Sequence, residues 1–169
     1  MISEARQAPQ VVTPDGRLIL SHPIAGLRFH DVRSVPTKSG VVTELWRPEW
    51  FGADTRPAHV VHVAMVGFGE TNWHCHRVQH DLLFVVRGHI RIAFYDDRED
   101  SDTYRQLLVL PFSAARPTLI AIPPGVWHAL RNAGPEEAAF VTMNDRAFEY
   151  EDPDDWRLPM GEGGLPKPF

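Results

Sequence analysis

Two histidines and an aspartate near the middle of the chain have the spacing of a shared site. His74 and His76 alternate, Asp81 follows five residues after His76, and Gly88 follows seven residues later. Because side chains two apart on a β-strand point to one face, both histidines would face one cavity and Cys75 would face away. Imidazole and carboxylate bind Zn, Fe, Mn or Ni, and they also transfer protons. The trio is therefore predicted to hold either a metal ion or a mobile proton.

A fourth candidate comes from a second stretch, Pro123–Asn132. Here a Pro-Pro-Gly turn is followed by a strand-like run that begins near His128. If two sheets fold over each other, His128 can meet His74, His76 and Asp81. A lone histidine would be an ordinary buried residue, but three histidines and a carboxylate in one cavity each need a polar partner.

The remaining sequence predicts short strands joined by turns. The chain has 15 prolines and 12 glycines, which are too many for long helices. A strand pair separated by Arg87-Gly88 is predicted to form a hairpin. The predicted strands are Arg17–Leu20, Leu27–Val32, Val41–Arg47, Ala58–Val66, Leu82–Val86, His89–Tyr95, Arg105–Leu110, Pro117–Ile122, Trp127–Arg131 and Ala138–Met143. Strands without intervening helices favour an all-β sandwich or jelly roll.

Composition limits the function classes. The 169 residues suffice for one core, and the net charge of −5 argues against a nucleic-acid surface, which needs clustered Lys and Arg. No apolar run approaches the roughly 20 residues of a membrane span, and no signal peptide is recognisable. A single cysteine excludes an internal disulfide and fits a reducing cytoplasm. We therefore expect a cytoplasmic protein with a small-molecule substrate.

Together, the two motif stretches resemble the cupin superfamily. The first reads His74-x-His76, Asp81 and Gly88, and the second reads Pro123-x-Gly125-x-x-His128-x-x-x-Asn132. The resemblance implies a single-domain, double-stranded β-helix, or jelly roll. In metal-binding cupins these positions supply three histidines and one carboxylate, usually Glu, so it implies His74, His76, Asp81 and His128 as ligands of a divalent metal ion. We expect residues 1–40 to form an N-terminal arm and edge strands, 41–143 the barrel, and 144–169 a C-terminal tail.

A narrower resemblance covers most of the chain. Val41–Trp50, Val85–Arg98, Ile122–His128 and Tyr150–Pro159 are similar to the dTDP-4-dehydrorhamnose 3,5-epimerase (RmlC-like) family. That resemblance implies a homodimer, here expected to form through the N-terminal strands, and metal-free proton transfer on a dTDP-linked keto-sugar. A histidine of the family removes a proton next to the ketone and a tyrosine acts as the acid. It implies His74 as the base if no metal is bound.

The sequence departs from that family at several site positions. The family's Arg-Gly-Leu-His run reads Thr71-Asn72-Trp73-His74 here, so its substrate-binding arginine is missing. Its tyrosine corresponds to Phe140, which cannot donate a proton, and its lysine corresponds to Asp81. The related sugar 3,4-ketoisomerases carry Gln at the Asp81 position.

Three functions remain open. The first is an isomerase or epimerase of a small carbonyl compound or nucleotide-linked keto-sugar, in which a metal ion replaces the lost tyrosine. His76 is then part of the catalytic centre, and His59 or His62 is the candidate base. The second is an Fe(II)-dependent dioxygenase, and the third is a non-catalytic cupin that binds a small ligand.

Overall fold

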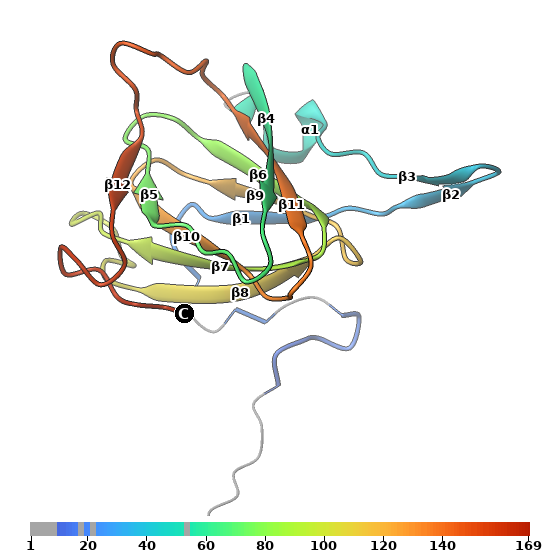
Figure 1. Ribbon diagram of the computed structural model, residues 1–169, viewed down its shortest axis with the longest axis horizontal. Coiled ribbons are helices and arrows are strands. Elements are labelled where there is room, and N and C mark those ends of the chain that lie inside the picture. The colour runs from blue at the N-terminus through green and yellow to red at the C-terminus, as the bar shows by residue number, and fades with distance from the viewer. Residues whose placement is uncertain (1–9, 17–18, 21–22, 53–54) are drawn as a thin grey trace, which may run out of the picture.

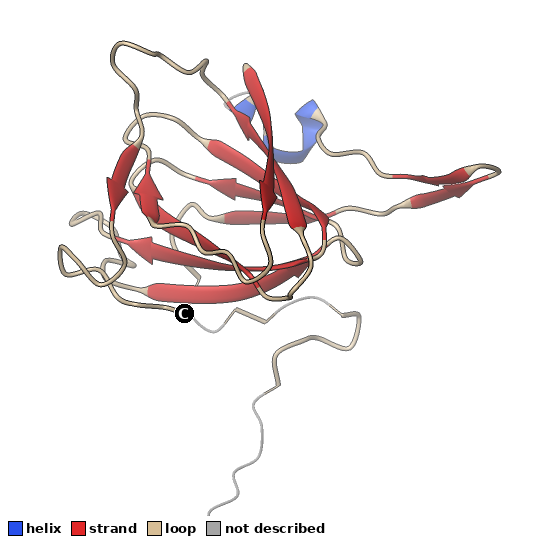
Figure 2. Ribbon diagram, viewed as in Figure 1, coloured by secondary structure: helices blue, strands red, loops and turns tan. Residues whose placement is uncertain are grey.

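The computed structural model describes residues 10–16, 19–20, 23–52 and 55–169, and its regular secondary structure is almost entirely β-strand (Figure 2). Two antiparallel five-stranded sheets face each other (Figure 1). The first sheet has the order β1 (Arg28–Asp31), β9 (Thr118–Ile122), β6 (Asp81–Arg87), β11 (Ala138–Asn144) and β4 (His59–Met65). The second has the order β12 (Trp156–Leu158), β5 (Trp73–Cys75), β10 (Val126–Asn132), β7 (His89–Asp96) and β8 (Leu107–Ser113). The predicted all-β jelly roll is confirmed.

Alternating apolar side chains on β7 show how the sequence builds the core. Ile90, Ile92 and Phe94 are fully buried between the two sheets, whereas His89 and Arg91 are exposed. Further along the strand the outward-facing side chains are buried too, because the C-terminal tail covers them. Tyr95, for example, is in one cluster with Leu165. The tail thus seals the outer face of the second sheet.

The outer face of the first sheet is covered differently. The sequence predicts a strand over Val41–Arg47, but only Gly40–Val42 is extended, as β3, and it pairs with β2 (Val35–Thr37). From Leu45 the chain instead packs on the sheet and turns into α1 (Pro48–Phe51). Pro48 cannot donate a ladder hydrogen bond, which suits a helix start better than a strand. The strand prediction for this run is therefore wrong beyond Val42.

The predicted hairpin at Arg87-Gly88 is also wrong. The two strands exist, but β6 pairs with β9 and β11, whereas β7 pairs with β8 and β10. Gly88 is a corner at which the chain passes from one sheet to the other. Its φ is +73°, and a Cβ atom there would lie 2.9 Å from the Cβ of Ala138. Glycine fits because it alone adopts this backbone without strain and leaves room for β11.

The β2–β3 hairpin projects away from the two sheets (Figure 1). All six of its strand residues are exposed. Of the N-terminal arm, residues 1–9 lie outside the described residues, as do Arg17 and Leu18 of the predicted strand Arg17–Leu20. Residues 19–20 are not in a strand. Among the described residues, no helix has the length and hydrophobicity that crossing a membrane requires.

Candidate active site and metal centre

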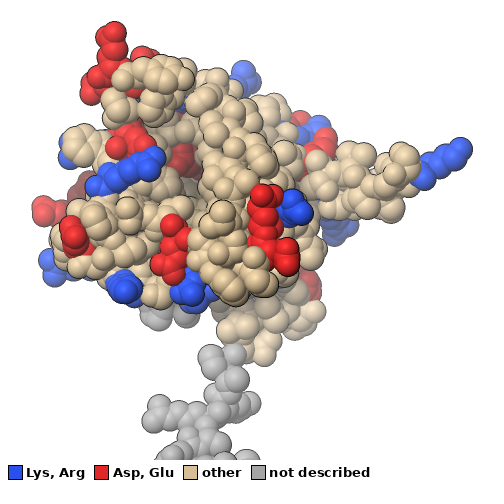
Figure 3. All heavy atoms as spheres, viewed as in Figure 1, with Lys and Arg blue, Asp and Glu red and all other residues tan. Residues whose placement is uncertain are grey.

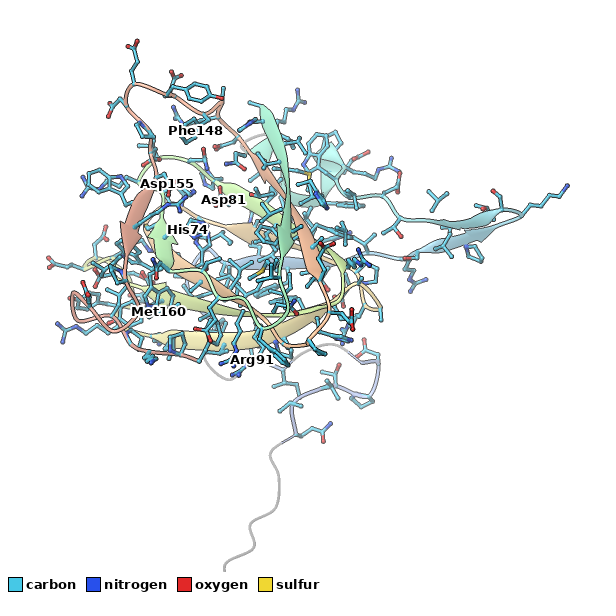
Figure 4. All side chains as sticks on the ribbon, viewed as in Figure 1. His74, Asp81, Arg91, Phe148, Asp155 and Met160 are labelled. Atoms are coloured by element: carbon cyan, nitrogen blue, oxygen red, sulfur yellow. The ribbon has the colours of Figure 1, made fainter. Side chains whose placement is uncertain are left out.

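Both sheets contribute to one group of polar side chains. His74 lies in β5 and is paired directly with His128 on the neighbouring strand β10. His76 follows just after β5, and Asp81 is the first residue of β6 in the opposite sheet. In Figure 4 the side chains of His74 and Asp81 lie close together between these strands. The fold thus brings all four candidate residues together.

The distances are those of a compact cluster around one carboxylate oxygen. Asp81 Oδ2 is 3.2 Å from His76 Nε2 and 3.3 Å from His128 Nε2. The rings of His74 and His128 are 3.8 Å apart between centroids. One donor atom each of His74, His76 and Asp81 lie within 4.8 Å of one another.

Neighbouring groups fix the orientation of three cluster residues. His76 Nδ1 lies against the backbone carbonyl of Asp154, and His128 Nδ1 lies 3.1 Å from the carbonyl of Val126. Asp81 Oδ1 accepts a 2.7 Å hydrogen bond from Gln79 Nε2. A histidine nitrogen beside a carbonyl must carry the proton, so the Nε2 atoms are the ones that face the centre.

Burial and mutual contacts set the charges of the cluster. Burial, and then the neighbouring His128, hold the pKa of His74 well below its ordinary value, so His74 is neutral. Burial also opposes the charge on His76, but the hydrogen bond and charge of Asp81 outweigh it and raise the pKa of His76 to about 9. Burial would raise the pKa of Asp81, yet its close contacts with His128 and His76 hold it well below its usual range. Asp81 is therefore ionised.

The donor and acceptor count shows whether a metal ion fits. Each ring of His76 and His128 faces an acceptor at both nitrogens: a carbonyl at Nδ1 and Asp81 Oδ2 at Nε2. Without a cation, a neutral ring at either position directs a nitrogen lone pair at one of its two acceptors. His128 Nε2 is buried and makes no hydrogen bond of good geometry. A divalent cation in place of the two Nε2 protons removes this conflict.

The ligand spacing agrees with that fit. Ligand atoms about 2.1 Å from one ion, at angles of roughly 90–110°, are about 3.0–3.4 Å apart. The two Nε2–Oδ2 distances of 3.2 and 3.3 Å are in this range. Three imidazoles and one carboxylate suit Zn, Fe, Mn or Ni, and the second contacts from carbonyls and Gln79 are of the kind that orient metal ligands. The group of His74, His76 and Asp81 could therefore hold such an ion, with His128 Nε2 beside Asp81 as a further ligand atom.

The cluster lies in a cavity of about 1080 Å³. Its walls come from β4, β5, β6, β10, β11 and β12, from the loop between β5 and β6, and from the segment between β11 and β12. His59 lines the cavity and His62 does not, because their side chains lie on opposite faces of β4. Phe140 lines it as well, and no tyrosine does so among the described residues.

Two arginines at the cavity were not predicted from the sequence. Arg77 and Arg146 line it, and among the described residues neither forms an ion pair with a carboxylate. The guanidinium of Arg77 instead lies 3.5 Å from the ring centroid of Trp156. A third arginine in the wall, Arg157, is neutralised by Asp155 at 2.8 Å. No sequence signal marks Arg77 or Arg146, since both lie in irregular segments.

Sequence relatives of this chain belong to polysaccharide and glycan biosynthesis. No protein-family profile matches the chain. A probable low-salt glycan biosynthesis epimerase of Haloferax volcanii is 28% identical over 138 residues, which are 80% of this chain and 88% of that protein. The spore coat polysaccharide biosynthesis protein SpsL of Bacillus subtilis is 31% identical over 106 residues, which are 56% of this chain and 70% of that protein. The chain belongs to the RmlC-like cupin family.

Solved structures of RmlC-like cupins share the fold. A dTDP sugar isomerase from Desulfovibrio desulfuricans superposes with a TM-score of 0.75 at 22% identity, covering 83% of this chain and 88% of that one. The dTDP-4-dehydrorhamnose 3,5-epimerase of Bacillus anthracis, with TDP and PPi bound, gives a TM-score of 0.71 at 20% identity and covers 85% of each chain. This RmlC-like cupin differs from the pattern that the family resemblance implies by its Asp81 and Phe140.

Proposed function

We propose that this RmlC-like cupin is an isomerase or epimerase of a nucleotide-linked keto-sugar, and that His74, His76, Asp81 and His128 hold a divalent metal ion at its centre. The single observation that carries the metal centre is the acceptor count at Asp81. The buried His128 ring and the partly buried His76 ring direct their Nε2 atoms at one carboxylate oxygen, while their Nδ1 atoms face carbonyls. A cation satisfies these groups together.

The ion would polarise a substrate carbonyl oxygen and lower the cost of removing a proton from the adjacent carbon. The chain itself must supply the group that moves this proton. We assign it to an imidazole nitrogen of His59, because it is the one histidine outside the cluster that lines the cavity among the described residues. Phe140 lies on β11, the strand next to that of His59, and holds no proton. A proton that His59 removes from one carbon and returns to the neighbouring carbon on the same face would isomerise the keto-sugar, whereas inversion at one carbon would need a donor on the other face.

The unpaired arginines support the nucleotide-linked substrate. Arg77 and Arg146 line a cavity that is large enough for a nucleotide sugar, and they are available to an anionic group. A guanidinium stacked on an indole keeps its N–H donors free at its edge, an arrangement suited to phosphate oxygens. The solved structures of related cupins include one with dTDP-quinovose bound, a 3′-monoepimerase from Streptomyces bikiniensis.

Deuterium exchange tests the reaction. The protein, loaded in turn with Fe, Mn, Ni and Zn, is incubated in D2O with a dTDP-linked 4-keto-6-deoxy sugar, and deuterium at the carbons next to the ketone is followed by NMR. We expect enzyme-dependent incorporation that His59→Gln abolishes. His62→Gln is the matched control, because His62 lies on the same strand outside the cavity, and we expect it to exchange like the wild type.

Two results would refute this function. One is the absence of incorporation with every metal. The other is dioxygen uptake by the iron-loaded protein with this sugar, which would make it a dioxygenase instead. Equal exchange in the His59→Gln and wild-type proteins would remove His59 from the mechanism.

We also propose that the protein is a homodimer in which the β2–β3 hairpin packs on a second copy. A lone two-stranded hairpin is marginally stable in water, and this one exposes 66% of Val41 and 55% of Val42. Light scattering after gel filtration should give a dimer for the wild type and for Val66→Asp, whose side chain is 75% exposed on the barrel. Val41→Asp should be monomeric, and a dimer of that variant would contradict the proposal.

A further inference from the structure

We propose that Asp154 is a positioning residue for the site, one that fixes His76 directly and Asp81 through Gln79. The inference rests on the proposed function only in taking His76 and Asp81 as site residues. Asp154 lies just before β12, in a segment that by sequence is an acidic, structural tail. Its neighbour Asp155 lines the same cavity as His74, and both residues are labelled in Figure 4.

The first contact is made by the backbone of Asp154. Its carbonyl oxygen accepts a hydrogen bond from His76 Nδ1. This contact selects the His76 tautomer and turns Nε2 toward Asp81 Oδ2. A ring nitrogen held in this way cannot rotate out of the cluster without losing a partly buried hydrogen bond.

The second contact is made by the Asp154 carboxylate. Its two oxygens accept hydrogen bonds from the backbone N–H groups of Arg77, Val78 and Gln79, at 2.8, 2.9 and 3.0 Å. These residues lie between β5 and β6, outside any strand, so no ladder partner satisfies their N–H groups. Hydrogen bonds to a carboxylate are stronger than neutral ones. Asp154 thus holds three of the four residues that separate His76 from Asp81, and the fourth, His80, is held by Asp145.

Gln79 passes this constraint on to Asp81. The Gln79 side chain is buried, and its Nε2 donates a 2.7 Å hydrogen bond to Asp81 Oδ1. That bond leaves Oδ2 as the oxygen that faces His76 and His128. One acidic residue of the C-terminal segment therefore sets the orientation of two groups of the site.

Strand pairing fixes the position of Asp154 and distinguishes it from its neighbour Asp155. β12 pairs with β5, so that Trp156 lies opposite Cys75 and Arg157 opposite His74. The Asp155 carboxylate is engaged by Arg157 and contacts none of the loop amides. Asp155→Asn is therefore the matched control for Asp154→Asn, which keeps the shape but has one acceptor oxygen for three N–H groups.

The test measures the hydrogen bond at His76 Nδ1 in the absence of substrate. The Nδ1–H resonance of His76 is assigned by proton–nitrogen NMR from its loss in His76→Gln, and its solvent exchange is then measured. We expect at least about tenfold faster exchange in Asp154→Asn and no change in Asp155→Asn. We also expect Co²⁺ to bind Asp154→Asn about 10–100-fold more weakly, as is typical when a group that orients a metal ligand is removed.

Unchanged His76 exchange in a folded Asp154→Asn variant would overturn the proposal. If that variant does not fold, amide hydrogen exchange in the wild type provides the test instead. The proposal requires that the amides of Arg77, Val78 and Gln79 are protected from exchange. Unprotected rates there would overturn it as well. Failure of Co²⁺ to bind the wild type, or of the sugar to exchange, would refute the proposed function and leave the His76 readout valid.

Discussion

We predict that the Asn132 side chain stabilises the barrel, and replacing its amide NH2 group by an oxygen atom tests this prediction. Its Nδ2 lies 2.7 Å from the carbonyl of Glu136, 3.0 Å from that of Val66 and 3.3 Å from that of Met65. Its Oδ1 accepts a hydrogen bond from Gly134 N. Asn132→Asp keeps the shape, but it points a carboxylate oxygen at three carbonyls from a side chain that is 1% exposed.

The cost follows from these contacts. Two hydrogen bonds of good length are lost at about 1 kcal/mol each, and burying an unpaired charge adds about 1–3 kcal/mol. We expect Asn132→Asp to lower the free energy of unfolding by about 3–5 kcal/mol at pH 7. In a protein of this size, that corresponds to a fall in melting temperature of about 6–20 °C. The deficit should shrink in acid, because a protonated carboxyl can donate again.

Urea unfolding followed by circular dichroism measures this difference. Asn72→Asp is the matched control, since Asn72 is exposed and the same chemical change there should stay within about 0.5 kcal/mol. A loss of less than about 1 kcal/mol in Asn132→Asp would refute the reasoning, because the amide would then not carry the three carbonyl contacts.

Three further predictions concern stability and reactivity. Gly88→Ala should lower the melting temperature by about 4–12 °C, from about 2–3 kcal/mol of backbone strain and contact with β11, whereas Gly134→Ala, with open space around it, should change it little. Burial raises the pKa of Cys75 to about 12, so a thiol reagent at pH 8 should modify it only after unfolding, and rapid labelling of the native protein would contradict its placement. Burial opposes the charge of Asp96, but hydrogen bonds from Arg98 and others hold its pKa below the usual value. The stabilisation from ionised Asp96 is therefore present above about pH 4 and is lost as the pH falls through the pKa of the folded state. The difference in free energy of unfolding between wild type and Asp96→Asn, measured in urea, should narrow below pH 4, and a constant difference would contradict this prediction.

The sequence predicted which four side chains would lie together, because short motifs fix their local positions. Strand alternation correctly separated His74 from Cys75, and the turn before His128 started a strand as expected. His128 lies opposite His74 because β10 and β5 are neighbours, a pairing that only the sheet order decides. The motif spacing nevertheless selected four residues that the fold brings close together.

The sheet assignment of β7 could not be predicted in the same way. Two apolar strands separated by Arg87-Gly88 fit a hairpin, and a glycine with positive φ is equally at home in a hairpin turn and a corner. What distinguishes the two is the close approach of Ala138, about 50 residues away in the chain. No local pattern carries that information.

The residues around the site were missed for a related reason. Gln79 and Asp154 act through hydrogen bonds that depend on β12 returning to pair with β5. In sequence, Asp154 is one of several acids in a polar segment, and Figure 3 shows acidic and basic side chains mixed across this view of the surface. Only the fold distinguishes an acid that caps three amides from one that faces solvent.

Metal content tests the central claim most directly. The untagged wild-type protein and His128→Ala are purified in parallel, reconstituted with Fe, Mn, Ni or Zn, desalted and analysed by mass spectrometry. The account predicts close to one equivalent of metal per chain in the wild type and its loss in His128→Ala. A wild-type protein that retains no metal after reconstitution would contradict the account and return the proton transfer to a metal-free site with His74 as the base.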